Sequence, residues 1–343
     1  MKKLLNTLFV TTQGAYLCHE GESVVVRVEQ EIKLRVPIHT LGGIVCFGQV
    51  SCSHPLMGLC GERGVAISYL SERGQFFARV HGPVSGNVLL RREQYRRADR
   101  LEVSASIARA FVVGKVANAR TVLQRAGRDH ADKGGGADIE KAVLRLGSLL
   151  EELKKDMPVD VLRGKEGEAA NTYFATFNHL ITAQKEDFAF TVRSRRPPLD
   201  NINALLSFLY TLLVHDASAA LEGVGLDPQV GFLHALRPGR PALALDLIEE
   251  LRPFLADRLA LSLVNLRQVQ GKGFEKSESG AVVMDDETRK TLLVAYQKRK
   301  QEEIRHPFIE EDVPVGLLFH VQALLLARHL RGDLDGYPPF LWR

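Results

Sequence analysis

The sequence predicts an α+β protein in which a small, mainly antiparallel β domain precedes a larger all-α domain. Apolar and polar residues alternate over much of residues 1–80, as they do in half-buried strands. After residue 87, apolar residues recur instead at helical spacing almost to residue 343. Between these regions, HGPVSGN has the glycine and proline content of a linker. We therefore expect a β domain over 1–85 and a helical domain over 86–343.

The expected strands of the first domain are separated by glycine, serine or charged residues. They are LNTLFVTT, AYLCHEG, SVVVRVEQEIKLRVPI (which alternates around VEQE), GGIVCFG, GVAISYL and GQFFARV. SHPLMGLCGER, between GGIVCFG and GVAISYL, suits one short helix.

The second domain opens with VLLRREQYRRADRLEVSASIARAFVVGKVANARTVLQRA, which predicts one long helix or two. The loop RDHADKGGGAD follows, and its glycines lack the GK[ST] ending of a phosphate-binding loop. Asp138 is expected to cap a helix in IEKAVLRLGSLLEELKKD, whose leucines form an apolar stripe.

The composition is that of a soluble globular protein, with 45% hydrophobic and 25% charged residues. The net charge of only +4 does not identify a polyanionic partner. No uninterrupted apolar run approaches the roughly 20 residues of a membrane span, and the N-terminus lacks a signal cleavage site. We expect a cytoplasmic protein with no membrane partner. The cysteines match no CxxC zinc spacing and are expected to be unpaired: Cys18, Cys46, Cys52 and Cys60.

An acidic cluster in an otherwise apolar segment is the first candidate site. GFLHALRPGRPALALDLIEELRP places His234 twelve positions before Asp246, with Glu249 three positions further on. RPGRPALAL is expected to form a short strand that leads into a helix beginning near Asp246. By itself the pattern favours a capping box, with Asp246 as N-cap and Glu249 reaching back to it. Glu249 could also face a ligand, and His234 alone is typical of a hydrogen-bonded core residue.

A second acid, Glu166, lies between Gly164 and Gly167 in VLRGKEGEAANTYFATFNHLI. We expect it at the start of a helix, where the helix dipole favours a carboxylate. The glycines beside it would also let a bulky partner approach, so a ligand-binding role stays open.

Four blocks of the sequence, taken in order, resemble one known family. They are GKEGEAANTYF, PPLDNINALLSFLYTLL, GFLH and the helix start DLIEE. This order is similar to that of the CRISPR-associated integrase and endonuclease of spacer acquisition, the first-numbered CRISPR-associated protein. SHPLMGLCGERGVAISYLSERGQFFARV resembles the β domain of that family, and the ending ARHLRGDLDGYPPFLWR resembles subtype I-C.

The resemblance implies a metal-dependent DNA endonuclease and integrase that inserts DNA fragments as spacers into a CRISPR array. A 3′-OH of the incoming DNA would attack phosphodiesters of the repeat. Position by position, the resemblance matches Glu166, His234 and Glu249 to the catalytic metal ligands and Asp246 to a supporting acid. It also implies a homodimer formed by the β domain. Its further partners would be double-stranded DNA and a dimer of the small second CRISPR-associated protein.

The proposed ligand set has a chemical preference of its own. Two carboxylates and one imidazole are mostly hard oxygen donors, which favour Mn²⁺ or Mg²⁺ over zinc. Three protein ligands leave positions for water and a phosphate oxygen, as attack on a phosphodiester requires.

Basic runs could supply contacts to DNA phosphates. Arg193, Arg195 and Arg196 lie in FTVRSRRPP, and Lys298 and Arg299 lie in YQKRKQEEIRHP; RREQYRRADR is a third run. Such runs are often only solvated helix faces that form ion pairs with nearby acids.

Two other functions remain open from the sequence. The first is a non-enzymatic DNA-binding scaffold in which the acidic residues only cap helices. The second is a hydrolase of another phosphate ester, which would need a closed small-molecule pocket in place of an open basic groove.

Overall fold

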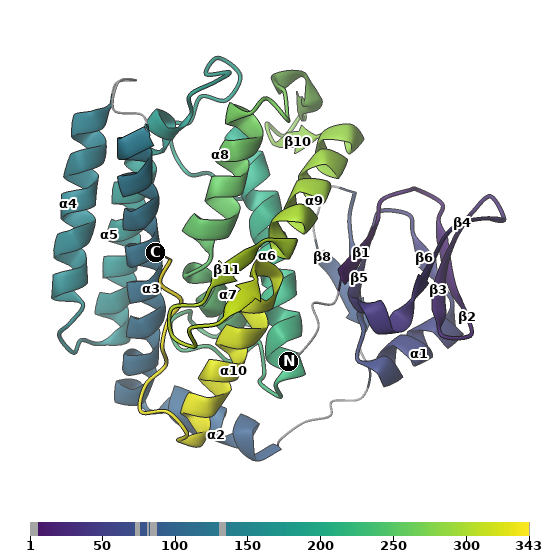
Figure 1. Ribbon diagram of the computed structural model, residues 1–343, viewed down its shortest axis with the longest axis horizontal. Coiled ribbons are helices and arrows are strands. Elements are labelled where there is room, and N and C mark those ends of the chain that lie inside the picture. Colours follow the sequence, from purple (N-terminus) through teal and green to yellow (C-terminus); the bar gives the residue numbers. More distant parts are fainter. Residues whose placement is uncertain (1–5, 73–75, 81, 83–87, 130–134, 343) are drawn as a thin grey trace. The chain divides into compact units, whose positions relative to one another are not determined.

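The computed structural model describes residues 6–72, 76–80, 82, 88–129 and 135–342 (Figure 1). The linker predicted over 81–87 lies outside the described residues except for Gly82, and so does most of the glycine loop before residue 135. The chain divides into two compact units. Unit 1 comprises Met1–Ser85 and Met284–Gln301, and unit 2 comprises Gly86–Val283 and Glu302–Arg343.

Unit 1 contains two four-stranded sheets. The strands of the first sheet, in spatial order, are β1 (Asn6–Val10), β5 (Leu41–Phe47), β7 (Ala66–Leu70) and β8 (Phe76–Val80). The strands of the second, in spatial order, are β4 (Glu31–Pro37), β3 (Ser23–Val28), β2 (Tyr16–Glu20) and β6 (Ser51–Cys52). Helix α1 (His54–Arg63) confirms the one short helix predicted in this region.

The strand pairing corrects the expectation of a mainly antiparallel domain. Among the described strands of unit 1, three pairs are antiparallel (β2–β3, β3–β4, β7–β8) and three are parallel (β1–β5, β5–β7, β2–β6). For β5–β7 the reason is topological: α1 carries the chain from β5 across to β7, and such a crossover returns the second strand in the same direction. The alternation of residue types, on which the expectation rested, does not distinguish the two kinds of pairing.

Residues from both sheets of unit 1 share one apolar core. Leu17 and Val24 of the second sheet and Ile44 and Ile67 of the first are fully buried in it. Burial of each such side chain contributes roughly 1.5–3 kcal/mol. The four cysteines are free, as predicted, and burial raises the pKa of Cys46 to about 12. Helix α9 (Asp286–Gln301) belongs to this unit, and its Gln297 Nε2 donates to the carbonyl of Thr7 at 2.8 Å.

Unit 2 is built mainly from helices, which the structure places at α2 (Val88–Asp99), α3 (Leu101–Asp129), α4 (Gly136–Glu152), α5 (Val159–Ala175), α6 (Asn201–Gly223), α7 (Ala242–Glu249), α8 (Arg258–Asn265) and α10 (Leu318–Arg331). The long segment after the linker therefore forms two helices, α2 and α3. Short 3₁₀ helices occur at Ile38–Thr40, Phe177–Leu180, Gly271–Gly273 and Val315–Leu317.

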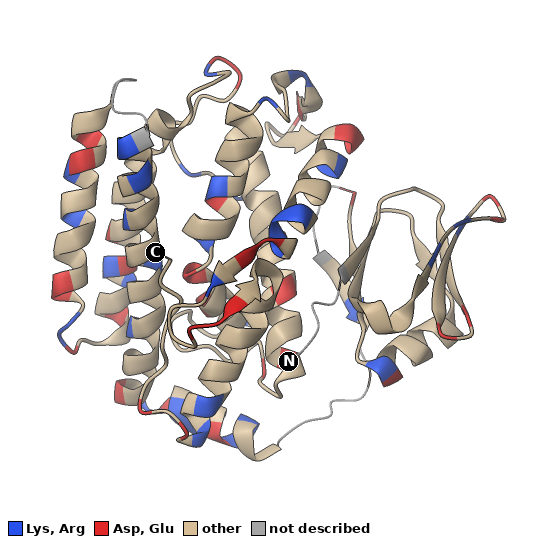
Figure 2. Cartoon of the chain, viewed as in Figure 1, with Lys and Arg blue, Asp and Glu red and all other residues tan. Residues whose placement is uncertain are grey.

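Helix α6 occupies the interior of unit 2. Charged residues are frequent on α4 and sparse along α6 (Figure 2). By length and composition α6 could cross a bilayer, but 56% of its most apolar stretch is buried inside the protein, as in the core helix of a globular domain.

Two expectations about unit 2 are corrected. The unit is not all-helical, because two small hairpins follow α8: β9 (Phe274–Lys276) with β10 (Val282–Met284), and β11 (Glu303–Arg305) with β12 (Asp312–Pro314). Three-residue strands are too short for an alternating pattern to reveal. Asp138 lies inside the first turn of α4, where the N-cap is Gly135 with a φ of 80°. A β region followed by a largely helical region is otherwise the predicted α+β architecture, and it is confirmed.

Candidate metal centre

The candidate residues of unit 2 come from helices α5 and α7 and from the turn before α7. Glu166 lies two turns inside α5 and not at its start, because Pro158 in extended conformation precedes a helix that begins at Val159. Asp246 likewise lies inside α7, which begins at Ala242 without a preceding strand. The capping-box interpretation of Asp246 is therefore wrong.

Asp246 instead binds the turn that carries His234. Its carboxylate is completely buried and accepts four hydrogen bonds. Oδ2 accepts from the backbone N–H groups of Phe232 and Leu233, at 2.6 and 3.0 Å. Oδ1 accepts from the backbone N–H of His234 at 2.9 Å and from its ring Nδ1 at 2.6 Å. These bonds compensate the cost of burying a charge.

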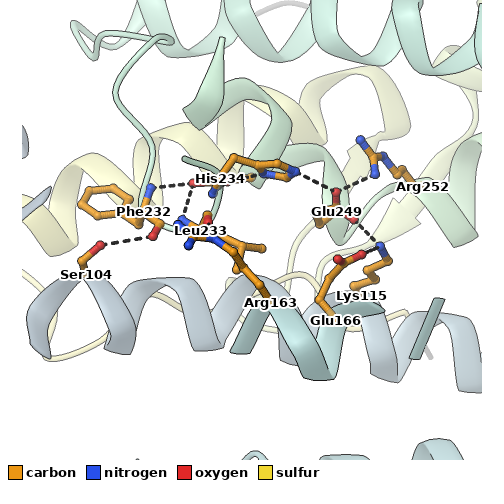
Figure 3. A network of polar contacts seen from close by, with 10 residues as sticks. Ser104, Lys115, Arg163, Glu166, Phe232, Leu233, His234, Glu249 and Arg252 are labelled. Carbon is orange, nitrogen blue, oxygen red and sulfur yellow. Dashed lines mark hydrogen bonds and ion pairs between the residues drawn. The ribbon is translucent and has the colours of Figure 1, made fainter. Parts of the chain in front are cut away.

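Two further helices hold the same turn. Ser104 of α3 donates to the carbonyl of Phe232 at 3.2 Å, and Arg163 of α5 donates to the carbonyl of Leu233 at 2.6 Å (Figure 3). Gly231 has no space for a side chain, since a Cβ there would lie 2.6 Å from Asp246 Oδ2 and 2.7 Å from a backbone carbon of α7. Helices α3, α5 and α7 therefore all form hydrogen bonds to the turn that carries the imidazole.

The bond to Asp246 also determines which nitrogen of His234 can bind a cation. A carboxylate only accepts, so Nδ1 carries a proton, and in the neutral imidazole the lone pair is on Nε2, on the far side of the ring. Nε2 faces Glu249, whose Oε1 lies 3.8 Å away. A carboxylate behind a histidine in this way is the usual support of a metal-binding imidazole.

Glu249 is almost fully buried and faces a cation on each oxygen. Oε1 accepts a hydrogen bond from Arg252 Nη1 at 2.5 Å, and Oε2 lies 2.7 Å from Lys115 Nζ (Figure 3). Burial by itself would raise the pKa of Glu249, but the positive charges of Arg252 and Lys115 outweigh it and lower the pKa to about 2. Glu249 is therefore ionised throughout the physiological pH range.

Lys115 of α3 connects Glu249 to Glu166. Its Nζ donates a short hydrogen bond to Glu166 Oε1 while it pairs with Glu249. The residue before Lys115 is Gly114, which has no side chain to hold α3 away from Glu250. A Cβ at this position would lie 2.8 Å from Glu250 Cβ. A glycine at this point lets α3 lie close against α7.

The donor set suits a divalent cation. In the described part of the chain, no three His, Cys, Asp or Glu side chains converge at ligand spacing as they stand. The ammonium of Lys115 lies between Glu166 and Glu249, and the buried Oε2 of Glu249 has that ion pair, at 2.7 Å, as its polar contact. Two carboxylate oxygens that share one cation in this way are chemically suited to Mn²⁺ or Mg²⁺ once the lysine nitrogen moves aside.

A second buried hydrogen-bond network is centred on Glu250, the residue that follows α7. Glu250 Oε1 accepts from Tyr337 Oη at 2.6 Å and from Gln322 Nε2 at 2.9 Å, and Oε2 accepts from the backbone N–H of Phe340 at 2.8 Å. Asn118 of α3 donates to the carbonyls of Glu250 and Phe340, at 2.7 and 2.8 Å. The segment 337–342 is thereby tied to both α3 and α7.

Replacing Glu250 by glutamine is expected to change how stability depends on pH. Burial raises the pKa of Glu250 from 4.5 to about 7. The folded protein therefore retains a proton there that the unfolded chain loses, so stability should fall as pH rises from about 4.5 to about 7. Asp257, with its pKa raised to about 6, contributes a slope of the same sign to both proteins. Denaturant unfolding between pH 5 and 8 should show a shallower slope for Glu250→Gln, and identical slopes would contradict this account.

The basic residues predicted to contact DNA differ in how far they are exposed to solvent. Arg195 and Arg196 are exposed in unit 2. Arg193 is turned inward: its guanidinium donates to Asn203 Oδ1 at 2.6 Å and lies over the ring of Tyr210, with a Cζ-to-centroid distance of 5.2 Å. On α9 of unit 1, Lys298 is exposed and Arg299 is half-buried. These runs stay predictions as DNA contacts.

Three residues of the centre were missed from the sequence: Lys115, Arg163 and Arg252. Lys115 carried a usable signal, because it is a lone charge in the apolar helical stretch FVVGKVAN. Arg252 lies three positions after Glu249, the spacing of a helical ion pair. For Arg163 we find no local signal, since its partner is a backbone carbonyl seventy positions away.

The fold and the site define a class of protein: a β unit and a helical unit, the latter with a buried cluster of carboxylates, histidine and cationic side chains. The chain belongs to the CRISPR associated protein Cas1 family, whose model matches residues 8–298. It is 56% identical over 343 residues to the CRISPR-associated endonuclease Cas1 1 of Chlorobaculum tepidum, covering all of both chains. It is 53% identical to the CRISPR-associated endonuclease Cas1 2 of Rhodospirillum rubrum, again over the full length of both.

Solved structures share the fold. A CAS1 protein from Thermotoga maritima matches with a TM-score of 0.81 and 24% identity over 96% of this chain and 97% of its own. A casposase bound to an integration product matches at 0.84 and 20%, over 99% and 95%. A chain of a Cas6-RT-Cas1–Cas2 complex matches at 0.83 and 22%, over 100% of this chain and 36% of its own. The family resemblance read from the sequence is confirmed, and with it the class of enzyme, an endonuclease; subtype I-C stays a prediction.

Proposed function

We propose that this protein is a divalent-metal-dependent DNA endonuclease and integrase that inserts DNA fragments as spacers into a CRISPR array. One observation carries the proposal beyond family membership. Glu166 and Glu249 both pair with the ammonium of Lys115, and the imidazole of His234 faces the carboxylate of Glu249. We propose these three side chains as the ligands of Mn²⁺ or Mg²⁺.

The neighbouring residues have defined tasks in this proposal. When bound, such an ion polarises a phosphoryl group and lowers the pKa of a coordinated hydroxyl. Asp246 holds His234 in the tautomer that presents Nε2, and Arg252 holds one oxygen of Glu249 in place. In integration, the 3′-OH of the incoming strand forms a bond to a repeat phosphorus while the existing P–O bond to the repeat strand breaks. One phosphodiester replaces another, so no energy source is needed.

DNA and protein partners follow from the same proposal. Arg195 and Arg196 are exposed and suited to phosphate contacts, as is Lys298. The edge strand β4 exposes Ile32 and Leu34, by 49% and 43%, which supports self-pairing of unit 1 in a homodimer. We further propose the small second protein, Cas2, as a partner, by analogy with the complex that shares this fold. A cytoplasmic location is implied by a chromosomal substrate.

The alternatives receive less support. In the scaffold hypothesis Asp246 and Glu166 cap helices, yet both lie inside their helices. Two cavities of about 390 and 560 Å³ have linings that contain none of the three proposed ligands, so neither serves a small-molecule phosphatase at this centre.

Removal of divalent metal is expected to abolish strand transfer while DNA binding persists. The test uses a labelled 3′-OH oligonucleotide and a duplex containing the repeat, with Mn²⁺ or with excess EDTA. We expect a joined product only with metal, because the carboxylates cannot activate a hydroxyl unaided. DNA affinity, measured in parallel by fluorescence anisotropy, serves as the control. Equal product yield with EDTA, or none with any divalent ion, would reject the proposal.

A further inference from the structure

Lys115 is a buried residue with few polar partners. The residue is 7% exposed in the middle of α3, where an ammonium without counter-ions would be strongly unfavourable. Its nitrogen contacts Glu166 Oε1 and Glu249 Oε2, and within the described residues it has no other hydrogen bond or ion pair. Lys115 is therefore the cation that the two carboxylates share.

The Glu166–Glu249 pair already has two cationic partners. Two carboxylates, Glu166 and Glu249, face two cations, Lys115 and Arg252. Arg252 approaches Glu249 through Oε1, whereas Lys115 lies against Oε2 and bridges to Glu166. A divalent ion bound between the two carboxylates would need the oxygens that Lys115 contacts. Two such cations within a few ångströms of one another repel strongly in a buried site.

We propose that Lys115 is a built-in competitor of the divalent cation, an affinity-determining residue whose ammonium must leave the Glu166–Glu249 pair before the cation binds there. The inference rests on the proposed metal-binding role of these carboxylates. The lysine stabilises the buried carboxylate of Glu249 beside the partly exposed carboxylate of Glu166. It weakens cation binding by the free energy of its own ion pairs. An unbranched lysine side chain, with its rotatable methylene groups, has the freedom to withdraw in this way.

The test compares Mn²⁺ affinity in variants of Lys115 by isothermal titration calorimetry, with the free-Mn²⁺ electron paramagnetic resonance signal as a second readout. Lys115→Met removes the charge at similar length, and we expect its Kd to fall at least about tenfold below wild type. Lys115→Arg keeps the charge, and we expect its Kd to be no lower than wild type. Lys165→Met is the control for the loss of one lysine charge, because Lys165, although next to Glu166 in sequence, pairs with Glu152 and Glu168 and with none of the proposed ligands.

The Mn²⁺ Kd values of the variants, compared with that of wild type, support or overturn the inference. A Kd for Lys115→Met equal to or higher than wild type would overturn the inference, as would equal tightening by Lys115→Arg. If Lys115→Met is unfolded without metal, recovery of its thermal transition by Mn²⁺ supports competition, and failure to recover overturns it. Wild type that shows no saturable Mn²⁺ binding, or the same Kd as His234→Ala, would instead reject the proposed metal centre itself.

Discussion

Replacing His234 by alanine is expected to lower the rate of Mn²⁺-dependent strand transfer by on the order of 1,000-fold, the loss of several kcal/mol of metal-based stabilisation. The imidazole is positioned by Asp246 with Nε2 directed to Glu249, so alanine removes the one nitrogen donor of the proposed set. The fold should persist, because His234 is only half-buried and the turn keeps its backbone bonds to Asp246.

A matched histidine elsewhere in unit 2 provides the control. His179 is also partly exposed and also faces a carboxylate, with Nε2 3.2 Å from Asp138 Oδ2. His179→Ala should leave strand transfer within a few-fold of wild type. Strand transfer is followed as joined product on denaturing gels, and circular dichroism checks the fold. A folded His234→Ala protein with wild-type activity would remove His234 from the centre.

Replacing Asp246 by asparagine is expected to cost about 3 kcal/mol of unfolding free energy and 10- to 100-fold in Mn²⁺ affinity. An amide offers only one acceptor oxygen, and its NH₂ group would point a donor at backbone N–H groups that the carboxylate now accepts. The ring of His234 would lose its fixed tautomer at the same time. Urea denaturation measures the first effect and calorimetric Mn²⁺ titration the second.

Asp200→Asn is the appropriate comparison for the same chemical change. Asp200 is the N-cap of α6, and its Oδ1 accepts from the backbone N–H of Asn203 at 2.7 Å, which an asparagine oxygen does equally well. The substitution loses only one bond, which Oδ2 accepts from Asn203 Nδ2 at 2.6 Å at a half-buried position. We expect its unfolding free energy to differ from wild type by less than about 1 kcal/mol. Similar small losses in both variants would show that the four bonds to Asp246 contribute little.

The fold was largely predictable because its signals are local. The six expected segments contain the seven longer strands that the structure describes in unit 1, and glycine, serine or charged residues between the segments marked the turns. The pairing directions were not predictable in this way, since they depend on where α1 carries the chain. The helix starts failed for a related reason. Asp138 and Asp246 are good N-cap residues, yet Gly135 and Pro241 occupy those positions.

Family resemblance singled out Glu166, His234 and Glu249 as candidate ligands, and that assignment stays a prediction. No local pattern shows which cations lie beside Glu166 and Glu249. That information lies in contacts between residues far apart in sequence, such as Lys115 with Glu249. Asp246 illustrates the same limit: its partners are backbone N–H groups twelve to fourteen positions earlier, which no capping rule anticipates.

The attachment of segment 337–342 has a consequence for protein synthesis. Asn118 contacts Phe340 and Trp342, so closing this part of unit 2 joins positions separated by more than 220 residues. A ribosome makes α3, α5 and α7 before residues 337–342. Until then Glu250, the residue that follows α7, lacks the hydrogen bonds that this segment donates to it. Nascent or prematurely terminated chains therefore carry the acids and the histidine without the finished scaffold.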